Sequence, residues 1–355
     1  MLPNNSHGRY RELGLIDMQS GGDVSRIVYS GVENIPGESV RDKMRYLQDK
    51  GDGLRRLLLS EPYGDPAMSV DLIVRPSHPK AQAGYIIMEA MGYPLYSGSN
   101  TICTATAILQ SGLVLMKEGE QSLVLESPAG LAHIKAVNEN GRVQSITTQG
   151  EPAYVAARDL EVTLPRGDTV TYDVVWSGAF FAMVDASQQG FELVRDEAIS
   201  LAAFGEVFIK AVREQFNQHH PELGDVGPVP FAHFMGPVES VGSEGFRSRS
   251  ATYVHPGVIC RSPTGTGTSA RLALMMERGE IEPGQWLETV SPRNSSFVGT
   301  LLGDGARVGE HRGVNSHITG RAWTLSHSHV LVDLDDPMVD TSDLEHLLTP
   351  PRSLP

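Results

Sequence analysis

The chain has 355 residues, 40% of them hydrophobic and 20% charged, a composition typical of a globular protein with room for one large domain or two. Its 29 basic and 43 acidic residues give a net charge of −14, which argues against nucleic acid or an anionic membrane as the main partner. Two cysteines, Cys103 and Cys260, are too few for a disulfide framework and fit a reducing compartment. No apolar stretch of about 18 residues occurs and the N-terminus is polar, so we expect a cytoplasmic protein outside membranes.

Short alternating or β-branched runs, bounded by turn residues such as Asn140-Gly141, predict strands along the whole chain. In chain order these runs are Leu15–Met18, Ser25–Ser30, Ser69–Val74, Gln121–Leu125, Ala132–Val137, Val143–Thr148, Thr169–Trp176, Phe180–Asp185, Thr252–Ile259, Trp286–Val290 and Val330–Leu334. Helical periodicity predicts four helices, at Glu38–Lys50, Thr101–Ser111, Asp196–Phe216 and Thr268–Arg278. Because strands outnumber helices and strand–helix alternation is scarce, the pattern predicts an α+β fold with mostly antiparallel sheets.

One stretch of the first half of the chain is echoed in the second half. Residues 94–106 read PLYSGSNTICTAT, and residues 263–273 read PTGTGTSARLA. When Ser97 is placed on Thr264, a hydroxyl residue, a glycine and a second hydroxyl residue fall on their counterparts. The repeat predicts two similar domains.

Both copies continue into a helix that is apolar nearly all round and ends at a glycine, Gly112 or Gly279. Helices of this kind are buried, so we expect each to be wrapped by the sheet of its own domain. We place the first domain at residues 1–164 and the second at residues 165–325, with residues 326–348 returning to the first.

The two repeated turns combine glycine and hydroxyl residues with the start of a helix. Such a turn exposes unpaired N–H groups and the positive end of the helix dipole, which together bind anions. Two turns facing each other across a cleft between domains would hold one small carboxylate or phosphate. The alternative is that Ser97, Ser99, Thr264 and Thr266 are ordinary helix caps. The duplication in corresponding places favours the anion site.

Several familiar motifs are missing from these turns. Neither turn contains the lysine of a nucleotide-binding phosphate loop, and Gly265-Thr-Gly267 is only a fragment of a dinucleotide fingerprint. Ser97 does not stand in the Gly-x-Ser-x-Gly setting of a hydrolase nucleophile. The paired histidines lack a third ligand at suitable spacing, so we expect no metal site; they are His219, His220, His327 and His329.

Four segments resemble the proline racemase family, which includes proline racemase, 4-hydroxyproline 2-epimerase and trans-3-hydroxy-L-proline dehydratase. They are Leu15–Val28, Glu61–Asp65, Ser177–Ala186 and, as the most specific match, Arg261–Arg271. The resemblance covers nearly the whole chain. It implies a diaminopimelate-epimerase-like fold: two pseudo-symmetric domains, each with a β-sheet wrapped round a central helix, and an active site in the inter-domain cleft.

The resemblance also implies a chemistry. Racemases of this family carry a catalytic cysteine in each loop, where this chain has Ser97 and Thr264. The dehydratase branch carries threonine at the second position. We therefore expect dehydration of trans-3-hydroxy-L-proline, or a close cyclic imino acid, to a Δ1-pyrroline-2-carboxylate through abstraction of the α-proton. Ser97 would be the base and Thr264 the opposing residue, with no metal or organic cofactor.

The family pattern further implies how the substrate is held. Backbone N–H groups of Gly98, Ser99, Gly265 and Thr266 would bind its carboxylate and stabilise the developing enediolate. The family's histidine is replaced by Ser99, and its ring-nitrogen aspartate by Cys260. Cys260 is either a substrate-binding residue or a buried small hydrophobe.

Two questions stay open from the sequence. Asp65 could provide a negative charge for the substrate amine, or it is a solvated turn residue. The function itself has two alternatives: an isomerase of the 4-hydroxyproline 2-epimerase or proline racemase type, and a catalytically weak homologue that only binds imino acids. The sequence also leaves open whether the protein forms a homodimer.

Overall fold

A computed structural model describes residues 9–33, 35–217 and 219–349, and within them seventeen strands are joined edge to edge by hydrogen bonds. The first half of the chain contributes β1 (Tyr10–Ser20), β2 (Asp23–Ser30), α1 (Val40–Lys50), α2 (Gly53–Leu58), β3 (Ser69–Val74), β4 (Ala83–Met88), α3 (Gly98–Gln110), β5 (Gly119–Ser127), β6 (Gly130–Glu139) and β7 (Arg142–Gln149). The polar segment before residue 9, on which we based the absence of a signal sequence, lies outside the described residues.

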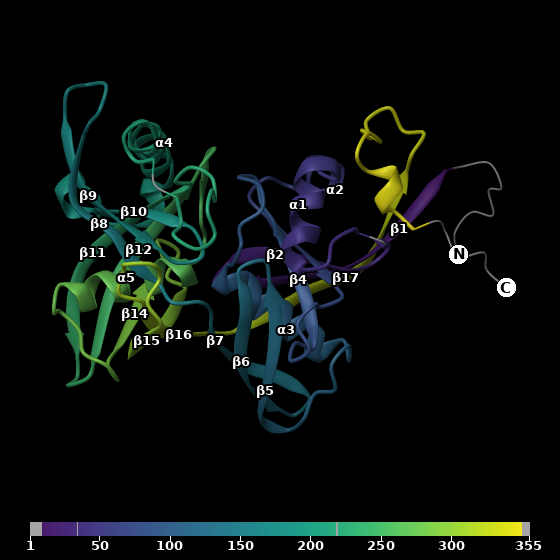
Figure 1. Ribbon diagram of the computed structural model, residues 1–355, viewed down its shortest axis with the longest axis horizontal. Helices are drawn as coiled ribbons and strands as arrows, with labels where there is room; N and C mark the ends of the chain where they lie inside the picture. The colour runs from purple at the N-terminus through teal and green to yellow at the C-terminus, as the bar shows by residue number, and fades with distance from the viewer. Residues whose placement is uncertain (1–8, 34, 218, 350–355) are drawn as a thin grey trace.

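The second half forms its own group of elements (Figure 1). These are β8 (Tyr154–Thr163), β9 (Thr169–Trp176), β10 (Phe180–Asp185), α4 (Ala198–Gln215), β11 (Phe231–Val241), β12 (Gly245–Val254), β13 (Val258–Ile259), α5 (Gly265–Glu277), β14 (Trp286–Val290), β15 (Ser296–Asp304), β16 (Val314–Gly320) and β17 (Ala322–Asp333). Short 3₁₀ turns occupy Ser187–Gln189, Arg195–Glu197 and Glu345–Leu347.

The two halves repeat one order of strand pairing. From β1 through β2, β3, β4, β5 and β6 to β7, successive pairs are antiparallel, parallel, antiparallel, parallel, antiparallel and antiparallel. The same order runs from β9 through β10, β11, β12, β14 and β15 to β16. Helices α1 and α2 fall between β2 and β3, and α4 falls between β10 and β11. The internal repeat predicted from the sequence is therefore present in the topology.

The last strand crosses from the second half to the first. Strand β17, yellow in Figure 1, runs from the second half to the first and pairs with β1, in the place that β8 has beside β9. Strands β7 and β16 also pair, so the halves share a continuous seam. Because β8 pairs with β9 across residue 164, a boundary there would divide a hairpin. The domain limits stay a prediction, and we propose that the second domain begins before β8.

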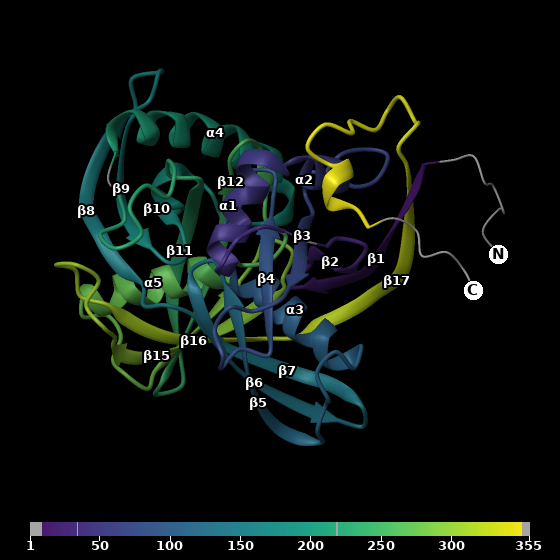
Figure 2. The same cartoon turned by 45° about the vertical axis from the view of Figure 1, so that its right-hand side comes forward.

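Helices α3 and α5 lie inside the two sheets (Figure 2), as their apolar sequences predict. Each packs in its own core cluster, around Ile102 and Ile108 for α3 and around Leu272 and Leu274 for α5. In both, a glycine with positive φ follows the C-cap residue and ends the helix. The outer helices α1, α2 and α4 lie together on one side of the molecule, over a third core cluster that spans both halves.

The four predicted helices are confirmed to within a few residues at each end, but the short helix α2 was not predicted, and the strands are predicted less completely. Five strands are missing from the prediction, namely β4, β8, β11, β15 and β16. The predicted strand Thr252–Ile259 is not continuous: it covers the end of β12 and all of β13, and the chain turns between them. Pro256 has no N–H for a ladder, and Gly257 takes a positive φ that closes the turn.

Over the described residues, no helix combines the length and the apolar character needed to cross a bilayer.

The first turn of α5 has no room for a larger residue at Gly267. A methyl group there would lie 2.6 Å from Nδ1 of the fully buried His233. We expect Gly267→Ala to lower the free energy of unfolding by about 1–3 kcal/mol, more than the ~1 kcal/mol that alanine gains over glycine in a helix. Urea unfolding measures this change. A loss no larger than that of Ser269→Ala, in the same helix, would contradict it.

Candidate active site

The N-termini of the two buried helices abut each other. A Cβ added to Gly98 would lie 3.3 Å from the Cα of Gly265, and one added to Gly265 would lie 3.3 Å from the Cα of Gly98. Only residues without a side chain allow two backbones to approach this closely. The repeated glycines of the two turns therefore bring two helix N-termini, and the positive ends of two helix dipoles, to one point.

Equivalent hydrogen bonds build the two N-termini. In α3, both the amide and the hydroxyl of Thr101 donate to the carbonyl of Ser97, at 3.0 and 2.6 Å. In α5, the amide and the hydroxyl of Thr268 donate to the carbonyl of Thr264, at 2.9 and 3.0 Å. These are the first bonds within each helix, so the three N–H groups before Thr101 and before Thr268 have no partner in their own helix.

Ser97 and Thr264 are the N-cap residues, but neither side chain caps its helix. Ser97 is extended, and its hydroxyl lies 3.3 Å from the hydroxyl of Ser99. Thr264 has φ +68° and ψ 108°, a conformation that a β-branched residue adopts only under strain. Both hydroxyls are thus left available for something other than the helix.

The Thr264 side chain is buried and unpaired. Thr264 as a whole is 9% exposed, and its Oγ1 has no hydrogen-bond partner among the described residues. Its amide donates to the Ser262 hydroxyl at 3.1 Å, which fixes the turn. A buried hydroxyl without a partner costs free energy, and this cost is relieved when a ligand supplies one.

One cavity between the halves collects most of the predicted site residues: Ser97, Ser99, Cys260, Thr264 and Thr266 line it. Gly98 and Gly265 do not line this cavity. Together with Thr266 they line a second cavity on the other side of the contact between the helix ends. The structure therefore brings both hydroxyl positions together in one cavity, and the two glycines line the neighbouring one.

Cys260 lines the cavity, and Cys103 does not. Burial, and then the negative charge of Asp23, raise the pKa of the Cys260 thiol well above its usual range; the nearby Thr264 hydroxyl opposes this rise. Cys103 is fully buried on α3, within the core of the first half.

Two carboxylates in the same cavity were missed by the sequence analysis. Asp23 begins β2, directly after Gly21-Gly22, and Glu89 directly follows β4. Burial raises the pKa of both. The available signal for Glu89 was an acid standing immediately after a buried strand, since every residue from Gly84 to Met88 is buried.

Two other residues that the sequence analysis considered, Asp65 and His220, lie outside this cavity. Asp65 is exposed, and its carboxylate accepts from the Ala67 amide at 2.7 Å, so it closes a turn and does not line the cavity. The His220 ring packs against Tyr154 and Trp176, and its Nδ1 accepts two backbone amides. In the part of the chain that the structure describes, no three His, Cys, Asp or Glu side chains are grouped as metal ligands.

The family model for proline racemase matches residues 15–341, so the chain belongs to the proline racemase family, as its sequence motifs suggested.

Relatives of known sequence and structure agree with this assignment. A protein of Chromohalobacter salexigens is 55% identical over 95% of this chain and 93% of its own. The 4-hydroxyproline 2-epimerase of Agrobacterium fabrum is 34% identical over 93% of this chain and 94% of its own. The crystal structure of a hydroxyproline epimerase from Agrobacterium vitis with bound trans-4-hydroxy-L-proline has a TM-score of 0.85 at 31% identity, covering 93% of this chain and 94% of that one.

A more distant likeness defines the fold class. A phenazine biosynthesis protein of the PhzF family from Bacillus anthracis has a TM-score of 0.55 at 15% identity, over 91% of this chain and 99% of that one. The predicted α+β, diaminopimelate-epimerase-like fold is confirmed. The chain is an enzyme-family member whose named relatives are epimerases, and the relatives do not single out the dehydratase branch that we expected.

The raised pKa of the Cys260 thiol gives a pH-dependent prediction. Iodoacetamide modifies the thiolate, and a raised pKa keeps the thiolate scarce at pH values where an ordinary thiol is ionised. We expect the modification rate to keep rising above about pH 8.5, where an ordinary thiol titrates. Mass spectrometry of the Cys260 peptide measures it, with the buried Cys103 as an unreactive internal reference. A plateau near about pH 8.5 would show an ordinary thiol.

Proposed function

We propose that this protein transfers protons at the α-carbon of a proline-like imino acid, and that its reaction is epimerisation of a hydroxyproline at C2. The observation that carries the proposal is the meeting of Ser97 and Thr264, two hydroxyls freed from capping, in one cavity at abutting helix N-termini. The epimerase relatives support this reaction more than the dehydration that the sequence alone favoured. We keep the prediction of a cytoplasmic protein acting on a small molecule.

The helix N-termini suit the substrate carboxylate. The amides of Gly98, Ser99, Gly265 and Thr266 precede the first intrahelical bonds, and two dipoles add their positive ends. When the α-proton leaves, its electron pair moves into the carboxylate and gives an enediolate with more charge on the same oxygens. N–H donors that already point at these oxygens stabilise the enediolate-like transition state more than they stabilise the bound substrate. This difference lowers the barrier to removal of the α-proton.

Epimerisation also needs a proton acceptor on one face of Cα and a donor on the other. Ser97 and Thr264 come from different halves, so each would address one face. The alkoxide of one takes the α-proton, the C–H bond breaks, and the hydroxyl of the other returns a proton to the opposite face. A hydroxyl ionises far less readily than a thiol, even beside helix dipoles, so the reaction is slower than with two cysteines.

Restoring the thiols tests these roles. We expect the double variant Ser97→Cys, Thr264→Cys to exchange the α-proton of trans-4-hydroxy-L-proline in heavy water about tenfold faster than the wild type, or more, because thiolates form at helix N-termini. Proton NMR measures loss of the Cα–H signal, and polarimetry measures the epimer. Ser97→Ala is expected to abolish exchange.

The matched control is Ser295→Cys, which adds a thiol at a half-buried serine outside the cavity. A double variant no faster than this control would remove Ser97 and Thr264 from the reaction. Binding of pyrrole-2-carboxylate without any exchange in wild type or variants would make the chain a binding homologue.

Dehydration is a second candidate, favoured by the absence of a thiol at both N-cap positions and by the unpaired Thr264 hydroxyl. It needs only one base. The Cα–H and C3–O bonds of trans-3-hydroxy-L-proline break, water leaves, and the enamine tautomerises to Δ1-pyrroline-2-carboxylate. Thr264 would assist the departing hydroxide.

A product assay separates the two reactions. If the protein is a dehydratase, incubation with trans-3-hydroxy-L-proline yields a cyclic imine that colours with 2-aminobenzaldehyde, and Thr264→Ala slows its formation. If it is an epimerase, as we propose, no imine forms, while trans-4-hydroxy-L-proline yields its C2 epimer. Imine formation at a rate above that of epimerisation would contradict the main proposal.

A further inference from the structure

We propose that Asp23 and Glu89 together bind the positively charged nitrogen of the substrate, and so restrict the site to zwitterions. The inference deepens the proposed function and rests on it, because it assumes a cyclic imino acid in the cavity of Ser97 and Thr264. Proline and its hydroxylated forms carry a secondary ammonium next to Cα. The helix N-termini can hold only the carboxylate of such a molecule, so its cation needs a partner of opposite charge.

The two carboxylates share the cavity with both hydroxyls. Asp23, Glu89, Ser97, Cys260 and Thr264 all line it. Asp23 is close enough to Glu89 for its charge to raise the pKa of that carboxyl, and both charges act on the thiol of Cys260. Negative charge is therefore concentrated in this cavity, beside Cys260 and next to the first turn of α3.

Neither carboxylate forms an ion pair within the described ranges. No Lys, Arg or His nitrogen there lies within 4.0 Å of either one, whereas Asp17 pairs with Arg26 at 2.9 Å. The more distant charge of Arg261 opposes the rise in the pKa of Asp23. Both residues are half-buried, and a negative charge that is partly removed from water without a close counter-ion is costly. A bound ammonium supplies the missing charge, in the way that the substrate carboxylate completes the unpaired amides of α3 and α5.

Glu89 is held so that one oxygen is occupied and the other is left for a ligand. Its Oε1 accepts from Ser69 Oγ at 3.1 Å and from Asn100 Nδ2 at 3.0 Å. Asn100 stands in the first turn of α3 and accepts from the hydroxyl of Ser25 at 2.7 Å, which orients its amide. Among the described residues, no donor reaches Oε2 of Glu89.

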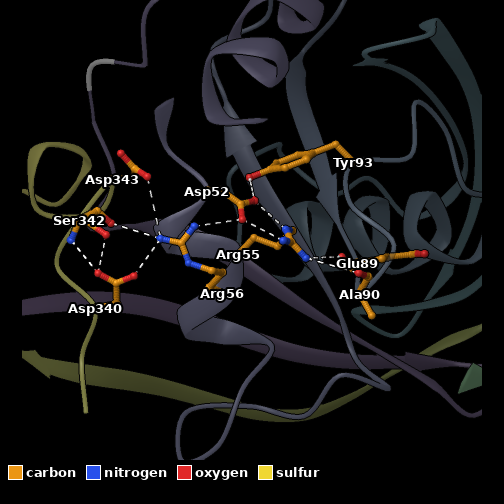
Figure 3. A network of polar contacts seen from close by, with 9 residues as sticks. All are labelled: Asp52, Arg55, Arg56, Glu89, Ala90, Tyr93, Asp340, Ser342 and Asp343. Carbon is orange, nitrogen blue, oxygen red and sulfur yellow. Dashed lines mark hydrogen bonds and ion pairs between the residues drawn. The ribbon is translucent and has the colours of Figure 1, made fainter. Parts of the chain in front are cut away.

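The backbone of Glu89 is anchored independently. Its carbonyl accepts from Arg55 Nη1 at 3.1 Å, and Figure 3 shows the Glu89 side chain extending away from that guanidinium. Arg55 is itself held by Asp52, at 2.7 and 2.8 Å, and Asp52 also accepts from the Tyr93 hydroxyl at 2.9 Å. Arg55 is thus engaged by Asp52 and the Glu89 carbonyl, and the Glu89 carboxylate remains without a cation.

Asp23 is fixed from the opposite half. Its Oδ1 accepts from the Arg261 amide at 2.6 Å, directly after Cys260. This hydrogen bond joins the start of β2 to the loop before α5, and it holds Asp23 beside Cys260. Thr264, which is 9% exposed, lines the same space, and its buried hydroxyl has no hydrogen-bond partner among the described residues, which is an independent sign that a ligand completes this site.

Binding of matched ligands tests the proposal without any variant. L-Proline carries an ammonium, and tetrahydrofuran-2-carboxylate replaces it with an uncharged ring oxygen of the same shape. By isothermal titration calorimetry at neutral pH, we expect the wild type to bind L-proline at least roughly tenfold more tightly. Equal affinities would overturn the proposal and leave the proposed function standing. If none of L-proline, tetrahydrofuran-2-carboxylate and pyrrole-2-carboxylate binds, both this proposal and the proposed function are overturned.

The variant Glu89→Gln then assigns the effect to the carboxylate. It should weaken binding of L-proline by about tenfold or more, and leave binding of pyrrole-2-carboxylate, whose nitrogen carries no positive charge, unchanged or tighter. A merely structural role would weaken both ligands alike, and that result contradicts the proposal. The matched control is Glu126→Gln, at a buried carboxylate that accepts from the Ser77 and His78 amides outside the cavity; it should change neither affinity.

Discussion

The contact between Gly98 and Gly265 is the constraint on which the rest of the structure depends. It places two helix N-termini, with their unpaired amides, at the centre of the molecule. Such amides can lie there only if the helices behind them are apolar and covered on all sides, which is what the sheets of the two halves provide. The repeated pairing order of the strands follows from this need, because each half encloses the same kind of helix.

The same constraint bears on how a protein of net charge −14 would hold the proposed acid. The overall field repels anions, so recognition would have to come from short-range donors in a buried place. Beside the starts of α3 and α5, the cavity also contains the carboxylates of Asp23 and Glu89. A zwitterion with adjacent charges would satisfy both the donors and the carboxylates, whereas a simple anion would leave the carboxylates uncompensated.

Local signals in the sequence predicted α3 and α5, their N-caps and their terminal glycines, because burial and capping depend on neighbours in the chain. Strands with irregular residues escaped prediction. Pro237 lies where the pairing of β11 with β12 shifts register, and Asp159 interrupts β8 with a positive φ. Asp23 and Glu89 escaped for a different reason. Nothing local brings the start of β2 and the end of β4 to one cavity; only the pairing of whole strands does so.

In the proposed reaction, the hydroxyls of Ser97 and Thr264 are weaker bases than thiols, and the carboxylates of Asp23 and Glu89 would offset part of that loss. An ammonium next to Cα withdraws electrons and makes the α-proton more acidic, whereas a neutral amine does not. Asp23 and Glu89 favour the charged form of the substrate nitrogen, since an opposite charge at short distance stabilises it. They therefore act on the same step as the helix N-termini, which stabilise the enediolate. On this proposal, the residues that select a zwitterion would also make its Cα–H bond easier to break.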